Sequence, residues 1–450
     1  MLLAAWTLFA FAGAYTWTTV PLVGGAILVA ARERPPILTA PNRLLDGALI
    51  ACLLLAAFTV VPLPARVRLA LSPGSAGIDR ALYLDAPPDA MIGPARALSV
   101  DPAATVGALV LGASFLLIFW SARAIANRHG LRETARGVAW MGLALSALTL
   151  MQHATAPRLL YWYWQPLDSH STPFGPYVSR NSLATWLIMA VPMTIGYGVA
   201  RYQSRHRDGG PFDLESTFDA TALWLAASAC LMLATTMVAL SRSGMTGMVA
   251  GLACLMWLAR RRITRSGWAW LAAVLLTLVA VAATYANWAA LANRVGETLA
   301  LGLAGRREIW RHTWRMIVDF PIAGVGLGAY ERAMSVYQPV PHVFFINHAH
   351  NQYLHLLAEG GVMVAVPAAI AAGATAWRIW RRLRADRTPV YWIRAGAASG
   401  LVALAVQSVW EVGLMLPANA VLFTILAAVA LHDGAPQRNP LAAARTIRNA

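Results

Sequence analysis

The sequence predicts an all-α polytopic membrane protein, and three observations lead to that fold class. Of the 450 residues, 58% are hydrophobic and only 12% are charged, which is about half the charged fraction of a soluble domain. Long apolar runs alternate with short polar segments. All 36 basic residues are arginine, and most of them lie between the apolar runs. We therefore expect one integral membrane domain over residues 1–450, in which the formal charge of +16 reflects topology and not nucleic-acid binding.

About twelve apolar runs are candidates for helices that cross a bilayer, which takes about 20 residues. They are residues 2–14, 20–31, 44–62, 103–125, 134–153, 178–200, 217–241, 243–259, 267–288, 352–374, 391–410 and 418–432. The first two are short, so they form either two spans or one bent segment broken near Pro21. No basic region precedes the first run, and a second run follows soon after, so we expect a retained span and not a cleaved signal.

Arginines follow every second run, as expected when basic connections stay in the cytoplasm. This alternation places both termini in the cytoplasm. The translocated side then carries an aromatic loop at 154–177, with Tyr161 to Trp164 at its centre, and a large loop at 289–350. We expect the large loop to carry short amphipathic helices.

A few arginines fall on the translocated side, against the charge bias, and an anionic ligand would explain them. Arg242 lies between two long apolar runs with almost no loop, flanked by the small residues Ser241, Ser243 and Gly244. The other reading of Arg242 is a boundary arginine whose charged end reaches the headgroups.

Residues 306–318 are predicted to form an amphipathic helix. Steps of three and four place one set of side chains on a single face, towards protein or lipid: Arg306, Trp310, Thr313, Trp314 and Ile317. A second stripe is expected to be solvated: Arg307, Arg311 and Arg315. An arginine on the apolar side is costly unless it is paired, so Arg306 is a candidate functional residue.

His350 and Asn351 stand directly before the apolar run that starts near residue 352. Asn351 is a plausible helix N-cap, and an imidazole at that position suits a general base near neutral pH. His348 and His355 raise a metal site as the alternative. Glu359 is the only nearby carboxylate, so we expect no metal.

Two further patterns argue against other chemistries. Cys52, Cys230 and Cys254 all lie within apolar runs, which predicts neither a disulfide framework nor a thiolate metal site. The glycines of Gly324-x-Gly326-x-Gly328 follow no predicted strand, so tight backbone packing suits them better than a nucleotide site.

These motifs together resemble those of the bacterial O-antigen ligase and O-antigen polymerase superfamily. The similar segments are Gly305-Arg306-x-x-x-Trp310, then Asp319-x-Pro321-x-x-Gly324-x-Gly326-x-Gly328, then His350-Asn351-x-x-Leu354-x-x-x-x-Glu359-x-Gly361. Upstream, Phe174 to Tyr177 with Arg180-Asn181, and the Ser241-Arg242-Ser243 turn, are similar to two further patches of the family. The similar region covers roughly residues 170–362.

The resemblance implies a glycosyltransferase in the bacterial inner membrane that works at the periplasmic face without metal, cofactor or nucleotide sugar. Its donor would be a glycan on undecaprenyl diphosphate or a related polyprenyl diphosphate. The acceptor would be lipid A core in a ligase, or another lipid-linked repeat unit in a polymerase.

The resemblance also implies roles for single residues. Arg242 and Arg306 match arginines that engage the donor diphosphate, and His350 matches the histidine that activates the acceptor hydroxyl. Supporting positions are Arg180, Asn181, His348, Asn351 and Glu359. Ser182 stands where many relatives carry a further histidine.

Of the functions considered, O-antigen ligase chemistry is the first expectation and a polymerase of lipid-linked repeats is the alternative. A transporter or flippase of lipid-linked glycan would line a path with charged residues inside its spans. The spans of this sequence are nearly free of internal charge, so an enzyme at a membrane surface is favoured.

Overall fold

A computed structural model describes residues 1–82, 95–166, 171, 173–205, 219–260, 262, 305–338 and 346–433. Within these ranges the regular elements are helices, and strand-like pairing is limited to isolated bridges. Seven of the described helices are long and apolar enough to cross a membrane. The all-helical membrane fold is thereby confirmed. The run at 267–288 lies outside the described residues, so the total of about twelve spans stays a prediction.

The seven candidate spans are α3 (Arg43–Phe58, preceded by the 3₁₀ turn η2 at Ala40–Asn42), α6 (Pro102–His129), α7 (Arg132–Thr155), α8 (Arg180–Arg205), α10 (Ala220–Val238), α15 (Gln352–Ala385) and α16 (Val390–Gln407). Three further apolar helices lie among them: α2 (Thr16–Glu33), α11 (Arg242–Ala259) and α17 (Pro417–Ala430). The shorter elements are α1 (Leu2–Phe9), α4 (Ala65–Leu71), α5 (Ser75–Leu82), α14 (Tyr330–Tyr337) and the 3₁₀ turns η1 (Phe11–Gly13) and η4 (Gly413–Met415).

The N-terminal segment is a helical hairpin and not one bent helix. α1 and α2 run antiparallel, since Trp6 Nε1 donates to the Thr18 carbonyl at 3.1 Å. The break falls at η1 and Pro21 lies inside α2, so the structure favours two helices over the alternative of one segment bent near Pro21. With 8 residues, α1 is about 12 Å long and too short to cross a bilayer.

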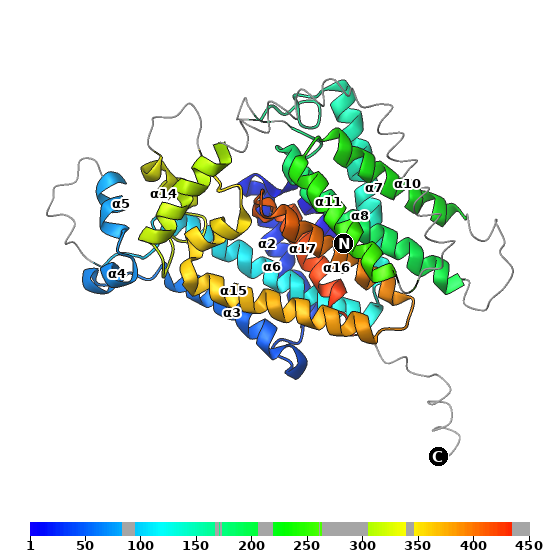
Figure 1. Ribbon diagram of the computed structural model, residues 1–450, viewed down its shortest axis with the longest axis horizontal. Helices are drawn as coiled ribbons and strands as arrows, with labels where there is room; N and C mark the ends of the chain where they lie inside the picture. The colour runs from blue at the N-terminus through cyan, green and yellow to red at the C-terminus, as the bar shows by residue number, and fades with distance from the viewer. Residues whose placement is uncertain are drawn as a thin grey trace, which may run out of the picture.

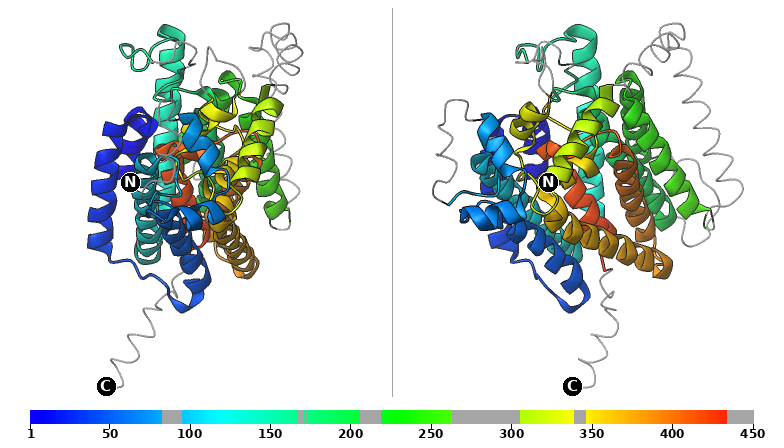
Figure 2. Two further views of the ribbon diagram at one scale, coloured as in Figure 1. Left: turned by 90° about the vertical axis from the view of Figure 1, so that its left-hand side faces the viewer. Right: turned by 60° about the vertical axis from the view of Figure 1, so that its left-hand side comes forward.

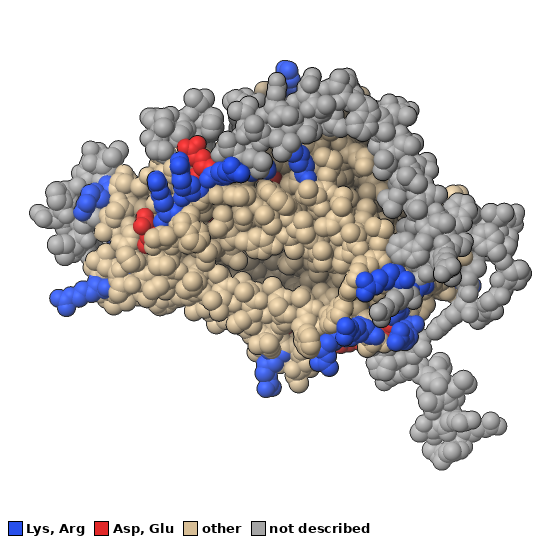
Figure 3. Space-filling view, viewed as in Figure 1, with Lys and Arg blue, Asp and Glu red and all other residues tan. Residues whose placement is uncertain are grey.

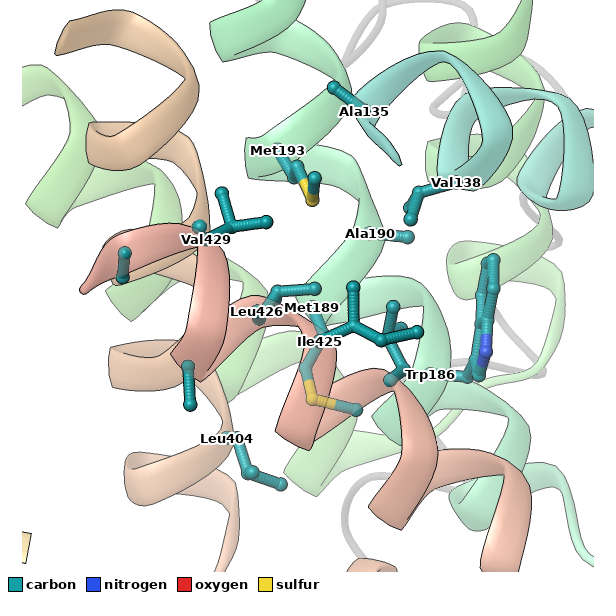
Figure 4. Close-up of a cluster of buried hydrophobic side chains, with 14 of the residues drawn as sticks. Ala135, Val138, Trp186, Met189, Ala190, Met193, Leu404, Ile425, Leu426 and Val429 are labelled. Atoms are coloured by element: carbon teal, nitrogen blue, oxygen red, sulfur yellow. The ribbon is translucent and has the colours of Figure 1, made fainter. Parts of the chain in front are cut away.

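The centre of the bundle is built on α8 and α16, which are the most buried of the seven candidate spans. Glycines let their backbones approach closely: a Cβ on Gly396 would stand 2.4 Å from the Pro192 carbonyl oxygen, and one on Gly400 2.5 Å from that of Met189. Small residues four apart are a common device for tight packing between membrane helices. Figure 4 shows apolar side chains of α7, α8, α16 and α17 meeting around this centre.

A second, smaller apolar core lies at one end of the molecule. It joins α5, a helix at residues 305–319, α14 and the start of α15. Figure 1 shows α4, α5 and α14 gathered at that end, and Figure 2 brings this end towards the viewer. Part of the predicted 289–350 loop therefore folds as a small helical lobe.

α15 is kinked where this lobe docks on it. Gly361 adopts φ 55° and ψ −166° inside the helix. The Val325 and Gly326 N–H groups donate to the carbonyls of Ala358 and Glu359, both at 2.9 Å. Gly324 approaches so closely that a Cβ there would stand 2.3 Å from the Glu359 carbonyl oxygen. The glycine run thus packs backbone against backbone, as the sequence predicts.

The arginines lie at the two edges of the bundle. Figure 3 shows many of the charged side chains gathered on two sides of the face it presents, with a broad uncharged band between them. One group includes the 305–319 helix, and the other lies near the end of α15 and the start of α16. An apolar belt between charged edges is the arrangement expected of a protein embedded in a bilayer.

Candidate active site

His350 is held in place by the start of α15. Asn351 caps this helix, because its Oδ1 accepts hydrogen bonds from the N–H groups of Tyr353 and Leu354, both at 3.0 Å. The predicted N-cap is therefore confirmed. His350 itself has φ 46°, an unusual value for a residue other than glycine. Backbone strain of this kind often accompanies functional positions.

The start of α15 is fastened to the end of α16. The Gln352 N–H donates to the Ser408 carbonyl at 2.8 Å, and the Tyr353 hydroxyl donates to the Ala405 carbonyl at 2.8 Å. These bonds bring His350 against the connection between α16 and α17.

Glu411 in that connection is the partner of His350. Glu411 Oε1 lies 3.8 Å from His350 Nδ1, with the histidine side chain 36% exposed and the glutamate side chain 8% exposed. Within the described residues neither His350 Nδ1 nor Glu411 Oε2 has a hydrogen-bond partner. The two side chains are thus close enough to interact. A small movement on substrate binding would shorten the distance between Nδ1 and Oε1 to that of a hydrogen bond, as is common at catalytic sites.

Glu411 is ionised at neutral pH despite its burial. Burial alone would raise its pKa, but the neighbouring His350, the Val412 N–H and the positive charge of Arg306 together hold the pKa below its usual value. The carboxylate therefore places a negative charge beside the imidazole of His350.

Arg306 reaches this pair because the 305–319 helix is tied to the segment before His350. Trp310 Nε1 donates to the Ala349 carbonyl at 2.9 Å. Arg306 is half-buried, and its charge acts on Glu411. Arg306, His350 and Glu411 therefore form one electrostatic group.

The predicted faces of this helix are partly correct. Thr313 and Ile317 are buried, and the stripe of Arg307, Arg311 and Arg315 is exposed. Trp314 was expected on the inner face but is 56% exposed. The buried side is rotated towards His312, which is 2% exposed and is a residue that the sequence analysis did not single out.

His348 and Glu359 have environments different from that of His350. Burial and the charge of His350 lower the pKa of His348 to about 4, so it is neutral at physiological pH. Glu359 Oε1 accepts the Tyr330 N–H at 3.3 Å and lies 3.5 Å from His355 Nε2. Among the described side chains, no group of three or more His, Cys, Asp or Glu has the arrangement of a metal site.

Arg180, Asn181 and Arg242 lie at the same edge of the bundle. Ser241 Oγ donates to Asn181 Oδ1 at 2.8 Å, which joins the starts of α8 and α11. Gln407 Nε2 donates to the Asn181 carbonyl at 3.4 Å, which links both to the end of α16 near Glu411. Arg180 and Arg242 are half-buried, and each makes further interactions.

The neighbouring aromatic loop also packs against this edge. Tyr177 donates its hydroxyl proton to Asn419 Oδ1 at 3.0 Å. Asn419 Nδ2 in turn donates to the Ser182 carbonyl at 3.0 Å. The position where relatives carry a histidine is thus engaged through its backbone.

Residues 227–369 match a family model described as O-Antigen ligase. This segment is similar to the O-antigen ligases. No curated protein matches the chain. The matched segment includes Arg242, Arg306 and His350, while Glu411 lies beyond it.

Proposed function

We propose that this protein transfers a glycan from a polyprenyl diphosphate to an acceptor hydroxyl, and that the site is the group of His350, Glu411, Arg306 and Arg242. The observation that carries the proposal is the half-exposed imidazole of His350 backed by the buried carboxylate of Glu411. An imidazole in contact with solvent on one side and a carboxylate on the other suits a general base.

In this proposal His350 takes the proton of the acceptor hydroxyl. Glu411 faces Nδ1, which favours the tautomer with the proton on Nδ1 and leaves Nε2 free to accept. As the acceptor oxygen attacks the sugar carbon, the bond from that carbon to the diphosphate oxygen breaks. Glu411 stabilises the imidazolium that forms.

The polyprenyl diphosphate leaves with its negative charge, and Arg306 and Arg242 are its proposed partners. Guanidinium groups bind phosphate oxygens through paired hydrogen bonds. A fixed cation beside the breaking bond stabilises the transition state more than the ground state. Arg180 and Asn181, at the same edge, are proposed to support the donor.

The remaining predicted residues are proposed to hold the site in shape. Asn351 caps α15 and so fixes His350. Glu359 anchors the start of α14 through the Tyr330 N–H. His348 is a neutral imidazole whose lowered pKa makes it a poor base.

We further propose that this edge faces the periplasm, that the connection after α2 and the C-terminus are cytoplasmic and that the membrane is the bacterial inner membrane. The support is the density of arginines at the opposite helix ends, such as Arg128, Arg132, Arg201 and Arg205. The 154–177 and 289–350 loops would then be periplasmic, within one integral membrane domain over residues 1–450.

The experiment supplies purified protein with lipid-linked repeat units, with and without lipid A core. Capture of the glycan on the core is the expected ligase result. Growth of the repeat without core would assign the polymerase alternative. Movement of intact donor across the bilayer, with no glycosidic bond broken, would contradict both and favour a flippase.

A further inference from the structure

A cluster of arginines lies at the bundle edge opposite the candidate active site. It consists of Arg123 of α6, Arg378, Arg381 and Arg382 of α15, and Arg394 of α16. The charges of the other four all act on Arg382. Cations from three helices therefore meet in one small region, near the end of α15 where Figure 3 shows blue side chains gathering.

Asp46, whose charge acts on Arg378, already has several hydrogen-bond donors. It is completely buried. Its Oδ1 accepts from Arg123 NH1 at 2.7 Å and from Trp120 Nε1 at 3.1 Å, and its Oδ2 accepts from the Leu38 N–H at 3.1 Å. Asp46 therefore neutralises Arg123 and has little left for a second arginine.

The other acids of the cluster are engaged as well. Asp386 Oδ2 lies 2.6 Å from Arg394 NH2, and its Oδ1 accepts from the N–H and the hydroxyl of Thr388, both at 2.8 Å. Asp433 pairs with Arg382, whose NH1 also donates to the His432 carbonyl at 3.2 Å. Each of the three carboxylates of this cluster thus has its own arginine.

Arg378 and Arg381 remain, and Arg381 is exposed to solvent, so Arg378 is the residue of interest. It is half-buried, and its Nε is a buried donor for which the described part of the chain offers no acceptor. Asp46 is the carboxylate whose charge acts on Arg378, but the positive charges of Arg123 and Arg381 oppose it, and a buried donor without an acceptor is destabilising. An external anion would complete the site.

The position of Arg378 identifies the kind of anion. It lies 17 residues beyond the kink at Gly361, which is about 25 Å along a helix and close to the about 30 Å thickness of the hydrocarbon core. The neighbouring Trp377 is 61% exposed, and exposed tryptophans favour the headgroup region. A headgroup phosphate is the anion present at this depth.

We propose that Arg378, with Arg382 and Arg123 beside it, binds the phosphodiester of an anionic phospholipid in the leaflet opposite the active site. The planar guanidinium presents Nε and a terminal nitrogen to two phosphate oxygens. The bound lipid would balance the cluster and hold the ends of α6, α15 and α16 together.

The test measures the melting temperature of the full chain in detergent micelles supplemented with phosphatidylglycerol or with phosphatidylcholine. A ligand that binds the folded state raises the melting temperature. We expect phosphatidylglycerol to give the larger increase for the wild type. Arg378→Gln should lose that increase, since removal of one charge-assisted pair weakens binding about tenfold or more.

Arg387→Gln is the matched control. Arg387 is exposed and lies just past α15, and this substitution removes the same charge as Arg378→Gln. It should keep the full increase with phosphatidylglycerol. Equal increases in Arg378→Gln and Arg387→Gln, or equal effects of the two lipids on the wild type, would overturn the proposal. So would an equal increase with inorganic phosphate alone, which would indicate a free-phosphate site.

If Arg378→Gln does not fold, Arg378→Lys is the variant to test. It retains the positive charge but loses the planar fork. The expected result is a reduced increase with phosphatidylglycerol, between those of the wild type and of Arg378→Gln. An undiminished increase would refute the paired contact to phosphate.

Discussion

His350 occupies its position because several local interactions converge on it. Asn351 caps the helix that follows, Trp310 fixes the carbonyl that precedes, and Ser408 holds the backbone at Gln352. Each of these bonds is made by an ordinary polar group. Their combined effect is to place one imidazole beside a buried carboxylate and near a guanidinium.

Arg306 and Arg307 give a matched pair of substitutions. Arg306→Ala should lower glycan transfer by about 10²–10³-fold, because one fixed cation near the leaving diphosphate is lost. Arg307→Ala should change the rate little, since Arg307 is exposed. The measurement is the transfer rate of each purified variant. Equal losses would show that the assignment of Arg306 to the donor is wrong.

The lowered pKa of His348 predicts that the stability of the folded protein depends on pH. Its folded-state pKa is lowered from 6.5 to about 4, so between these values the unfolded chain binds the proton and the folded chain does not. Stability is then complete above pH 6.5 and decreases as the pH falls towards 4. One pKa unit corresponds to about 1.4 kcal/mol.

Between pH 7 and pH 5, His348→Gln should therefore lose less stability than the wild type, because it lacks the imidazole that takes up a proton on unfolding. Melting temperatures at the two pH values give the comparison. An identical decrease in both proteins would show that His348 does not contribute.

At the scale of the helix, α15 combines two segments that meet at Gly361. The kink exists because residues 321–326 pair with the backbone of residues 358–363, as in the Val362 N–H bond to the Pro321 carbonyl at 2.9 Å. The same contact positions the lobe that carries Arg306. The kink thus connects the fold of α15 to the geometry of the site.

Gly361→Ala should disrupt this connection. Gly361 has φ 55°, and a Cβ there would stand 2.2 Å from the Ile322 carbonyl oxygen. We expect a loss of about 2 kcal/mol or more in unfolding free energy, together with a loss of transfer activity. Thermal unfolding and the transfer assay measure the two effects.

Gly373→Ala is the control on the same helix, because a Cβ there would meet nothing within 4 Å. It should leave activity unchanged and stabilise the helix by up to about 1 kcal/mol. A mild Gly361→Ala phenotype, similar to that of Gly373→Ala, would mean that the kink does not hold the site.

Local signals carried much of the prediction from sequence. The capping preference of Asn351 and the stepping of Arg307, Arg311 and Arg315 depend on near neighbours alone, and the structure confirms both. Glu411 has no such signal. It lies 61 residues after His350, and only the packing of α16 against the start of α15 brings the two together.

Two further features also depend on tertiary packing and were not predicted from the sequence. The inner face of the 305–319 helix is set by the lobe that packs against it, which buries His312 and leaves Trp314 exposed. The break in the N-terminal hairpin falls at η1 because the chain must reverse there, and Pro21 is accommodated inside α2. Neither outcome is encoded by spacing alone.

At the scale of the whole molecule, the two edges of the bundle have different chemistry. The edge with the candidate site joins His350, Glu411 and Arg306 with the starts of α8 and α11. The opposite edge carries the arginine cluster, whose acids are engaged by their own partners. This asymmetry predicts one orientation in the membrane.

Single-cysteine labelling tests that orientation. In a chain whose three cysteines are replaced by alanine, a membrane-impermeant maleimide should label Arg307→Cys from the periplasm of intact cells. Arg387→Cys should react only after the inner membrane is opened. Both positions are exposed in the fold. Labelling of both from one side would refute the proposed topology.

The most direct test of the central claim is glycan transfer by three purified proteins: wild type, His350→Ala and Glu411→Gln. We predict that His350→Ala loses about 10²–10⁴-fold in rate and that Glu411→Gln lowers kcat with little change in KM for the donor. His348→Ala removes the neighbouring imidazole and should lower the transfer rate less than His350→Ala does. Transfer at the wild-type rate by His350→Ala would contradict the assignment of the base and with it the proposed mechanism.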